Sequence, residues 1–302
     1  MRRFFVVVFL CLASGAGCVN DPSGDRGEGG SGGVGAAGGT GGTAAGGDGG
    51  GGEGGGGGEG GNTEPCEVEV VAPPVVLGLD AFYEKYIDAA GIPILSSAAT
   101  PDETLVVACR IARQMVSFRD DVRVAMIARG ARIAIMAEHE VTTDIPEHSD
   151  LDVVFPDIDW DTRARGLGGT ITRPATSCAE ENLLCYPTDR YRGENILVHE
   201  FAHGMVHLGI RFVDPTFDSR LAAAFEEAID SGLWAGTYAA SDSEEYWGEG
   251  VQSYFDANVE AIPPNGIHNH VNTRSELQSY DPRLFALIEE IYGAASWTPD
   301  CP

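Results

Sequence analysis

Basic residues are scarce in this 302-residue sequence. Only 19 Lys and Arg stand against 46 Asp and Glu, which gives a formal net charge of -27. A surface of this sign repels nucleic acid and anionic lipid headgroups, so we expect no nucleic-acid partner. The acidic surface favours solubility, and it could also favour basic substrates.

Long apolar runs are lacking as well. The apolar run at residues 4–13 is too short to cross a bilayer as a helix and is typical of a signal peptide. Small residues directly before Cys18 resemble a bacterial lipoprotein processing site, so we expect residues 1–18 to be a lipoprotein-type signal peptide with Cys18 lipidated. An ordinary secretory signal is the alternative. Both export the protein, either to the bacterial cell envelope with a lipid anchor in the membrane or to the extracellular space.

Side chains that could build a core are missing from residues 19–65, where glycine is the commonest residue. Ordering such a segment costs backbone entropy that no apolar burial offsets, so we expect a flexible tether. Residues 66–302 are long enough for one sizeable domain. We expect this domain to be a monomer.

The sequence has no Cys-x-x-Cys pair, which argues against a cysteine-based zinc site. An exported domain can keep disulfides. We expect Cys178 to pair with Cys185, which is close in sequence, and Cys66 to pair with Cys301 at the other end of the domain. Cys109 is then left unpaired and buried on a helix.

Apolar spacing predicts an α+β fold with a small sheet before the midpoint and mostly helices after it. Thr100, followed by Pro and by Glu three residues later, predicts a capped helix start. Residues 141–170 are rich in Asp, Pro and Gly and predict a long structured loop. The predicted helices are 79–89, 100–117, 120–128, 193–209, 218–232, 243–258 and 281–293, and the predicted strands are 92–95, 131–137 and 166–172.

Residues 196–203 read I-L-V-H-E-F-A-H, which contains an H-E-x-x-H motif. On a helix His199 and His203 lie on one face, so both can hold one zinc ion at about 2.0 to 2.1 Å. Glu200 lies beside them and can take a proton from the attacking water and pass it to the leaving amine. The alternative is a helix whose histidines are only half-buried and hydrogen-bonded. Apolar residues already fill the buried face, which argues against that alternative.

A catalytic zinc needs a third protein ligand and an open position. The extended motif with a third histidine fails because Val206 and Gly209 occupy the required positions, and His207 would have to stretch around an ion that is already bracketed. A second helix is the better source, because Glu245 and Glu249 are four residues apart. One can bind the metal while the other orients a ligating histidine. The alternative is a solvated acidic turn at a helix N-terminus.

The H-E-x-x-H motif is followed by Tyr-x6-Glu-x3-Glu at residues 238–249. Together they resemble the gluzincin-type zinc metallopeptidases of the lethal-factor and Pro-Pro endopeptidase kind. The resemblance covers roughly residues 194–256. It implies a zincin-like domain with a sheet-bearing N-terminal lobe and a helical C-terminal lobe. It also implies one Zn²⁺ with Glu245 as third ligand, Glu249 as the carboxylate on a ligating histidine, and Tyr238 as the donor that stabilises the oxyanion.

Gly248 departs from that pattern, since the group commonly has alanine there. We expect the glycine to loosen the second helix slightly. Outside the core the chain also resembles a family of exported proteins, through residues 143–147 and 271–274.

Other residues near the expected site have more than one possible use. Arg190 and Arg192 could bind a substrate carboxylate, but loop salt bridges are the expected use in so acidic a protein. His268 and His270 could line the cleft or form a further metal site, and we expect both to be surface histidines. The strand predicted at 166–172 could add an extended peptide at its edge.

The leading hypothesis is a zinc metalloendopeptidase that hydrolyses peptide bonds of a peptide or protein substrate with a metal-activated water. A second hypothesis is a surface binding protein that keeps the metal for structure and has no turnover. A third is an amide hydrolase that acts on cell-wall material, because the same water permits that reaction.

Overall fold

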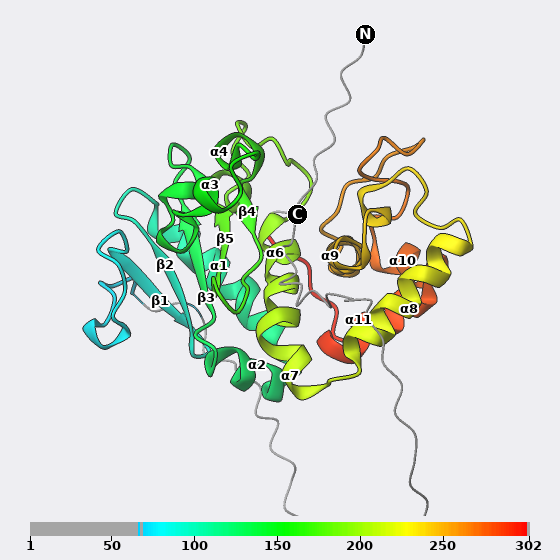
Figure 1. Ribbon diagram of the computed structural model, residues 1–302, viewed down its shortest axis with the longest axis horizontal. Helices are drawn as coiled ribbons and strands as arrows, with labels where there is room; N and C mark the ends of the chain where they lie inside the picture. Colours follow the sequence, from blue (N-terminus) through cyan, green and yellow to red (C-terminus); the bar gives the residue numbers. More distant parts are fainter. Residues whose placement is uncertain (1–65, 67–68, 301–302) are drawn as a thin grey trace, which may run out of the picture. The chain divides into compact units, whose positions relative to one another are not determined.

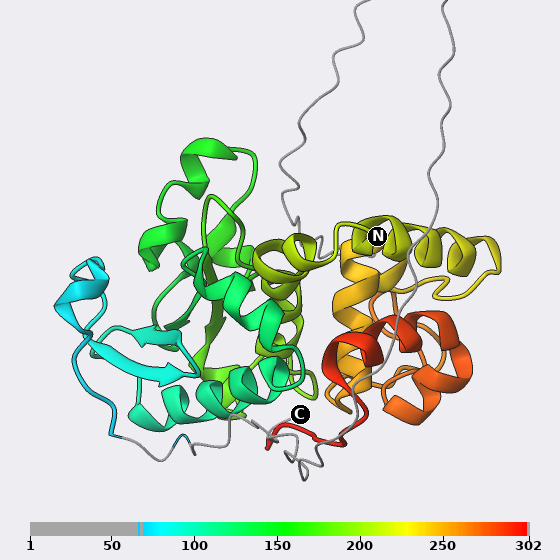
Figure 2. The same cartoon turned by 90° about the horizontal axis from the view of Figure 1, so that it is seen from below.

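The computed structural model describes Cys66 and residues 69–300 (Figures 1 and 2). The expected signal peptide, Cys18 and the tether at 19–65 lie outside these described residues. Within them, no helix has the length and the apolar character that a bilayer-crossing segment needs.

One mixed sheet of five strands, in the order β1-β2-β3-β5-β4, lies before the midpoint of the domain. β1 and β2 form an antiparallel hairpin, β2, β3 and β5 are parallel, and the short edge strand β4 is antiparallel to β5. The strands are β1 (Lys85–Ala89), β2 (Ile92–Ser96), β3 (Arg132–Met136), β4 (Gly166–Leu167) and β5 (Ala175–Ala179).

Helices α1 to α4 lie between the strands in the chain and the other α-helices follow β5, and together with the sheet they make the mixed α+β fold expected from the sequence. α6 contacts β4 and β5 of the sheet and also α9, so it lies between the sheet and the C-terminal helices (Figure 1). The α-helices are α1 (Asp102–Val116), α2 (Asp120–Ile127), α3 (Leu151–Val154), α4 (Trp160–Arg163), α5 (Glu180–Leu183), α6 (Ile196–Met205), α7 (Arg211–Val213), α8 (Phe217–Asp230), α9 (Ser243–Tyr254), α10 (Arg274–Tyr280) and α11 (Pro282–Tyr292). The shorter turns are η1 (Val75–Leu77), η2 (Thr142–Asp144), η3 (Pro146–His148) and η5 (Tyr238–Ala240), and η4 (Val206–Ile210) is a π-helix.

Both faces of the sheet are buried at its central strands β2, β3 and β5. Ile133 and Ile135 of β3 belong to the main apolar core, which also contains residues of α1, α6, α9 and α11. Ala134 and Met136, which point to the other face, belong to a smaller apolar cluster. This two-sided burial is typical of parallel strands, and it makes the sheet a rigid support for α6.

The helix predicted at 79–89 is wrong, because the second half of this segment is strand β1. Ala90 and Gly91 have φ values of 58° and 90° and form the turn of the hairpin to β2. Pairing with β2 outweighs the helical spacing of the apolar residues, a tertiary effect that local patterns miss.

Strand β5 and helix α10 were not among the predicted elements. The start of α10 does carry a sequence signal, the capping box formed by Thr273 and Glu276. β5 reads Ala-Thr-Ser-Cys-Ala and is buried along its whole length, so it shows no alternation of polar and apolar residues. The strand predicted at 166–172 is only the two-residue β4. The loop at 141–170 contains the short helices η2, η3, α3 and α4.

The helix predicted from Thr100 is confirmed as α1, but the predicted cap is wrong. α1 begins at Asp102 with Pro101 at the N-cap, and no side chain caps it. The Thr100 hydroxyl is buried and has no hydrogen-bond partner among the described residues. Because the helix begins after Pro101, Thr100 lies one residue too early to bond its first amide groups.

The cysteine pairing also differs from the prediction. Cys66 is bonded to Cys109 of α1, with an S–S distance of 2.07 Å, so Cys66 is not paired with Cys301. Cys178 is free and buried in the main core from β5, so the pairing of Cys178 with Cys185 is wrong. Cys185 is disulfide-bonded. A disulfide is consistent with an exported protein.

His148, in η3, is buried, and this burial predicts a pH-dependent stability. Burial lowers the pKa of His148 from 6.5 to about 4, and nearby Arg173 lowers it further, while a hydrogen bond to the Ala175 backbone and the charge of Asp150 oppose the shift. The His148 side chain binds a proton near pH 6.5 in the unfolded chain but only near pH 4 in the folded chain. We therefore expect stability to fall by about 3 kcal/mol as the pH drops through this window and not to fall further below it on this account.

The measurement is urea unfolding at a series of pH values between 7.5 and 4. His148→Gln should flatten the slope of unfolding free energy against pH, and the same replacement at the exposed His139 is the control. An equal slope in the wild type and in His148→Gln would contradict the assignment.

Candidate metal centre

Two buried asparagines set the start of α6. The side-chain oxygen of Asn195 accepts a hydrogen bond from the Val198 amide at 3.0 Å, and that of Asn182 accepts one from the Ile196 amide at 2.8 Å. These bonds satisfy amide groups that a helix leaves open at its first turn. All ten residues of α6 are buried, so the side chains of its H-E-x-x-H motif are held firmly between the sheet and α9.

Glycines let the edge of the sheet approach α6 closely. A Cβ atom on Gly168 would lie 2.6 Å from Cβ of His203, and one on Gly166 would lie 3.1 Å from Cγ of Glu200. The backbone of Gly168 also stabilises the charged form of the Glu200 carboxylate and so opposes the rise of its pKa. The edge of the sheet at β4 is thereby placed directly beside the motif.

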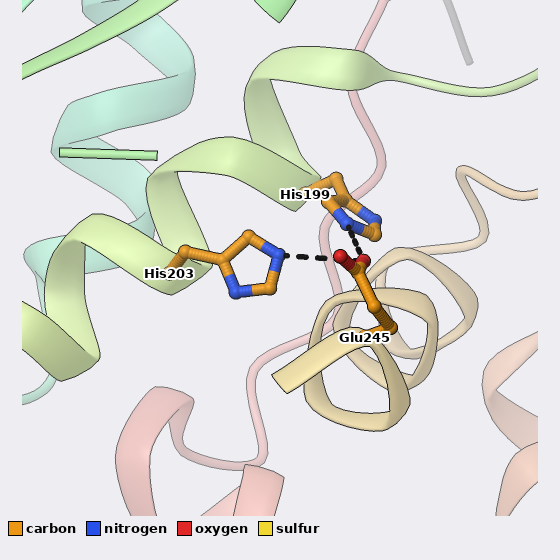
Figure 3. Close-up of side chains that lie close together, drawn as sticks. All are labelled: His199, His203 and Glu245. Atoms are coloured by element: carbon orange, nitrogen blue, oxygen red, sulfur yellow. Dashed lines mark hydrogen bonds and ion pairs between the residues drawn. The ribbon is translucent and has the colours of Figure 1, made fainter. Parts of the chain in front are cut away.

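His199, His203 and Glu245 come together across the interface of α6 and α9 (Figure 3). Nε2 of His199 lies 3.1 Å from Oε2 of Glu245, and Nε2 of His203 lies 3.8 Å from the same oxygen. Asp242 caps α9 by accepting hydrogen bonds from the amides of Glu244 and Glu245, which fixes Glu245 in the first turn of this helix. All three members of the cluster are buried.

These separations fit a tetrahedral zinc ion. Two ligand atoms about 2.1 Å from zinc, at the tetrahedral angle, lie about 3.4 Å apart. The observed distances of 3.1 and 3.8 Å bracket this value. Two imidazoles and one carboxylate are also a donor set that zinc accepts.

Several buried polar atoms at this cluster have no hydrogen-bond partner in the described structure. They are Nε2 of His203, Oε1 of Glu245 and Oε1 of Glu200. Each such atom costs about 1 to 3 kcal/mol when it is left unsatisfied, so finding three together indicates a site built for a ligand.

A second cluster, Glu194, Glu249 and His268, has ligand atoms within 4.8 Å of one another. Its members are hydrogen-bonded: His268 lies 3.4 Å from Glu194, and Glu249 accepts from Asn258 at 3.0 Å. None of its atoms is among the buried unsatisfied atoms of the described chain. His268 is buried, so the expectation of a surface histidine is wrong for this residue, while His270 is exposed.

Burial disfavours charge on most groups of the centre. It raises the pKa of Glu200 to about 8, an effect that the charge of His199 reduces and that of Glu245 increases. It also raises the pKa of Glu245 and lowers that of His203 well below its usual value. For His199 burial alone lowers the pKa, but the hydrogen bond to Glu245 and the charges of nearby carboxylates outweigh it and raise the pKa to about 10. The carboxylates around Nε2 of His199 therefore stabilise a positive charge at the position between this nitrogen and Glu245.

Gln252 orients His199 by a hydrogen bond, whereas the resemblance implied that Glu249 would contact a ligating histidine. The side-chain amide of Gln252 donates to the backbone carbonyl of Asn195 at 3.3 Å, so its oxygen must accept at the other end. That oxygen lies 2.8 Å from Nδ1 of His199, whereas Oε1 of Glu249 is 3.9 Å away. Nδ1 therefore carries the proton in the neutral ring, and Nε2 is left to bind a metal.

The expected role of Glu249 stays a prediction, because its Oε1 lies near Nδ1 of His199 but further away than the Gln252 oxygen. Gln252 lies seven residues after Glu245, two helical turns along the same face of α9, and this spacing is the signal that could have indicated it.

His207 is not part of the cluster. Its two ring nitrogens lie 3.2 Å from the carbonyl oxygen of Gly169 and 3.1 Å from Oε1 of Glu244. Glu244 also accepts from Arg211 at 3.0 Å, so it is not a freely solvated carboxylate. His207 thus joins the end of α6 to the start of α9.

Gly248 has a steric role instead of the expected loosening of α9. A Cβ atom there would lie 2.6 Å from Cε1 and 2.7 Å from Nε2 of His199. Contacts this short do not occur between real atoms, so any larger residue must displace the imidazole or push the two helices apart.

We expect Gly248→Ala to weaken zinc binding by roughly 10- to 100-fold, the range typical of disturbed metal-ligand support. Competition with a chromogenic chelator measures this affinity. Gly250→Ala is the matched control, because its added methyl group would meet Leu284 at 2.5 Å and not His199. Equal zinc affinity in the two variants would contradict the steric role.

A small pocket of about 40 Å³ adjoins the cluster. His199, Glu200, Tyr238 and Glu249 are among its lining residues. Tyr238 begins η5, its amide is bonded to the carbonyl of Ile267 at 2.8 Å, and its side chain hydrogen-bonds Glu245. The pocket has room for a few water-sized groups beside Glu200.

Comparison with known protein families and with curated proteins finds no match to this sequence. Among solved structures, the chain is similar to that of the Pro-Pro endopeptidase PPEP-2 from Paenibacillus alvei. The TM-score is 0.44 and the sequence identity 15%, over 66% of this chain and 96% of that chain.

Proposed function

We propose that this protein is a zinc-dependent peptidase in which His199, His203 and Glu245 hold the metal. The observation that carries the proposal is the group of buried polar atoms on His203, Glu245 and Glu200 that have no hydrogen-bond partner in the described chain. These three atoms find interaction partners only when a ligand binds, so ligand binding would stabilise the folded chain.

The residues around the cluster have the chemistry for hydrolysis. A bound zinc ion would lower the pKa of a water ligand and polarise the carbonyl of the bond to be cleaved. Glu200 faces the same pocket with a carboxylate oxygen that has no partner, so it can accept a proton from the attacking water and return it to the leaving amine. Tyr238 can donate its hydroxyl to the negative oxygen that develops in the transition state.

A purely structural metal site would need neither Glu200 nor Tyr238. Structural zinc sites are closed by four protein ligands, whereas this cluster offers three and adjoins a pocket. Glu200 and Tyr238 line that pocket, and this arrangement favours turnover over a structural ion.

Metal content tests the ligand set without any substrate. We expect the purified wild type to contain one zinc ion per chain, measured by mass spectrometry of the metal. His203→Ala should weaken zinc binding by more than the roughly 10- to 100-fold that loss of an outer partner costs.

His207→Ala is the matched control, since His207 is a buried histidine one turn further along that lies outside the cluster. It should retain the ion. Full zinc content in His203→Ala, or loss of zinc from both variants alike, would contradict the ligand assignment.

A further inference from the structure

A second and larger pocket opens beside the metal-site pocket. Its volume is about 710 Å³, and we call it the side pocket. It shares Tyr191, Glu194 and Ile267 with the small pocket at the metal centre. A chain bound across the centre would therefore extend into the side pocket.

Three arginines line the side pocket: Arg163, Arg190 and Arg192. None of them forms an ion pair with a carboxylate of the described residues, so the expected loop salt bridges of Arg190 and Arg192 are absent there. Most other basic residues of the described chain are paired, as Arg165 is with Glu181. In a chain with 46 acidic residues and 19 basic ones, three such arginines at one pocket are unexpected.

Of the three arginines, Arg190 is held in place by neutral partners. Nη1 of Arg190 donates to the carbonyl of Thr162 at 2.8 Å, and its guanidinium lies 5.3 Å from the centre of the Tyr191 ring. Nη2 of Arg163 is buried and has no hydrogen-bond partner in the described chain. Arg192 is exposed. The guanidinium groups thus keep donors for an incoming anion.

Three acidic residues also line the side pocket, so its formal charge is balanced. Two of them have other partners. Asp159 caps α4 by accepting from the Thr162 amide at 3.1 Å and from its hydroxyl at 2.9 Å, and Glu194 lies 3.4 Å from His268. Asp157 is exposed. The carboxylates therefore do not neutralise the arginines by direct contact.

We propose that the side pocket binds a carboxylate of the peptide substrate through Arg163, Arg190 and Arg192. The inference rests on the proposed function, because it makes the side pocket part of the binding site for the cleaved peptide. A guanidinium presents a planar fork of donors that matches a carboxylate. The carboxylate is either an Asp or Glu side chain near the cleaved bond or the free C-terminus of the peptide.

The net charge of -27 opposes an acidic peptide at long range. The arginines therefore attract the carboxylate only at short range, once the peptide lies in the side pocket. They slow the dissociation of the bound peptide and do not speed its approach. Selection of a carboxylate inside an acidic protein excludes peptides that are acidic throughout and favours one carboxylate at a defined position.

Binding can be tested apart from hydrolysis. The full chain carrying Glu200→Gln is immobilised with zinc and exposed to a synthetic mixture of ten-residue peptides. Each position carries Glu or its neutral isostere Gln, and each peptide has either a free or an amidated C-terminus. Mass spectrometry of the retained peptides gives the enrichment of Glu over Gln and of carboxylate over amide.

We expect a carboxylate at one position to be enriched by at least about tenfold, because the free energy of one charge-assisted hydrogen bond corresponds to a factor of this size in affinity. Adding Arg163→Gln and Arg192→Gln should reduce this enrichment to less than about twofold. Arg192→Gln alone, at an exposed site, is expected to fold and to reduce the enrichment partially. Arg110→Gln, an exposed arginine of α1 that pairs with Asp300, is the matched control and should leave the enrichment unchanged.

Enrichment of Glu at an internal position identifies an acidic side chain, and enrichment of the free over the amidated C-terminus identifies the terminal carboxylate. Equal retention of charged and neutral peptides, retention of none, or enrichment that survives the arginine substitutions would overturn the inference. Cleavage by the wild type is read separately, so a protein that selects carboxylates but cleaves nothing would refute the proposed function and leave the side pocket standing.

Discussion

Glu200→Gln is expected to lower kcat by about 10³-fold, because general acid–base catalysis contributes roughly 10² to 10⁴. Glutamine has nearly the same shape as glutamate but cannot accept a proton from the attacking water. Zinc content should stay at one ion per chain, since Glu200 is not in the proposed ligand set. The measurement is cleavage of the peptide that the wild type cleaves best in a library screen, together with metal analysis of both proteins.

The control for this substitution is Glu226→Gln, which makes the same chemical change at an exposed position on α8. It should cleave at the wild-type rate. A Glu200→Gln variant that retains zinc and cleaves within a few-fold of the wild type would refute the role of Glu200 as general base. Loss of zinc from this variant would instead show that Glu200 supports the metal.

Removal of zinc by a chelator is expected to abolish peptide cleavage while the chain stays folded. The main core runs through the sheet and α1, α6, α9 and α11, and apolar burial there does not depend on the ion. On the proposed function zinc binds the folded chain and not the unfolded one, so its loss should lower stability by about 4 kcal/mol at a free concentration a thousand times Kd. For a domain of this size that corresponds to a fall in Tm of roughly 10 °C.

Cleavage, circular dichroism and Tm are measured before chelation, after it, and after zinc is added back. Restored cleavage and restored Tm support a catalytic ion. Collapse of the circular dichroism signal on chelation would point to a structural ion instead. Cleavage that survives complete removal of zinc would refute the proposed chemistry.

The predicted site residues differ in how far the sequence alone could place them. The spacing of His199 and His203 puts them on one face of any helix, and their segment is helical in the structure. Glu245 lies on a different helix, and residue spacing alone left it equivalent to Glu249. Resemblance to a known group distinguished the two, and the structure brings Glu245 to both histidines.

Other features of the site depended on contacts that no spacing rule contains. Gln252 bonds His199 because α6 and α9 cross at that point, and Gly248 is small where the imidazole fills the space between the helices. Arg163 reaches the same pocket as Arg192 only because the loop that carries α4 folds over the residues before α6.

The sequence by itself determined the helical elements with strong apolar periodicity, such as α1, α8 and α11, because neighbouring turns of one helix bury one stripe of residues. It also determined the order of the motif residues along the chain. Only the tertiary structure decided which cysteines pair, that residues 85–89 form a strand, and that Gln252 orients His199. These outcomes depend on contacts between segments far apart in sequence, whose free energies are comparable with local propensities and are not encoded in any short stretch of residues.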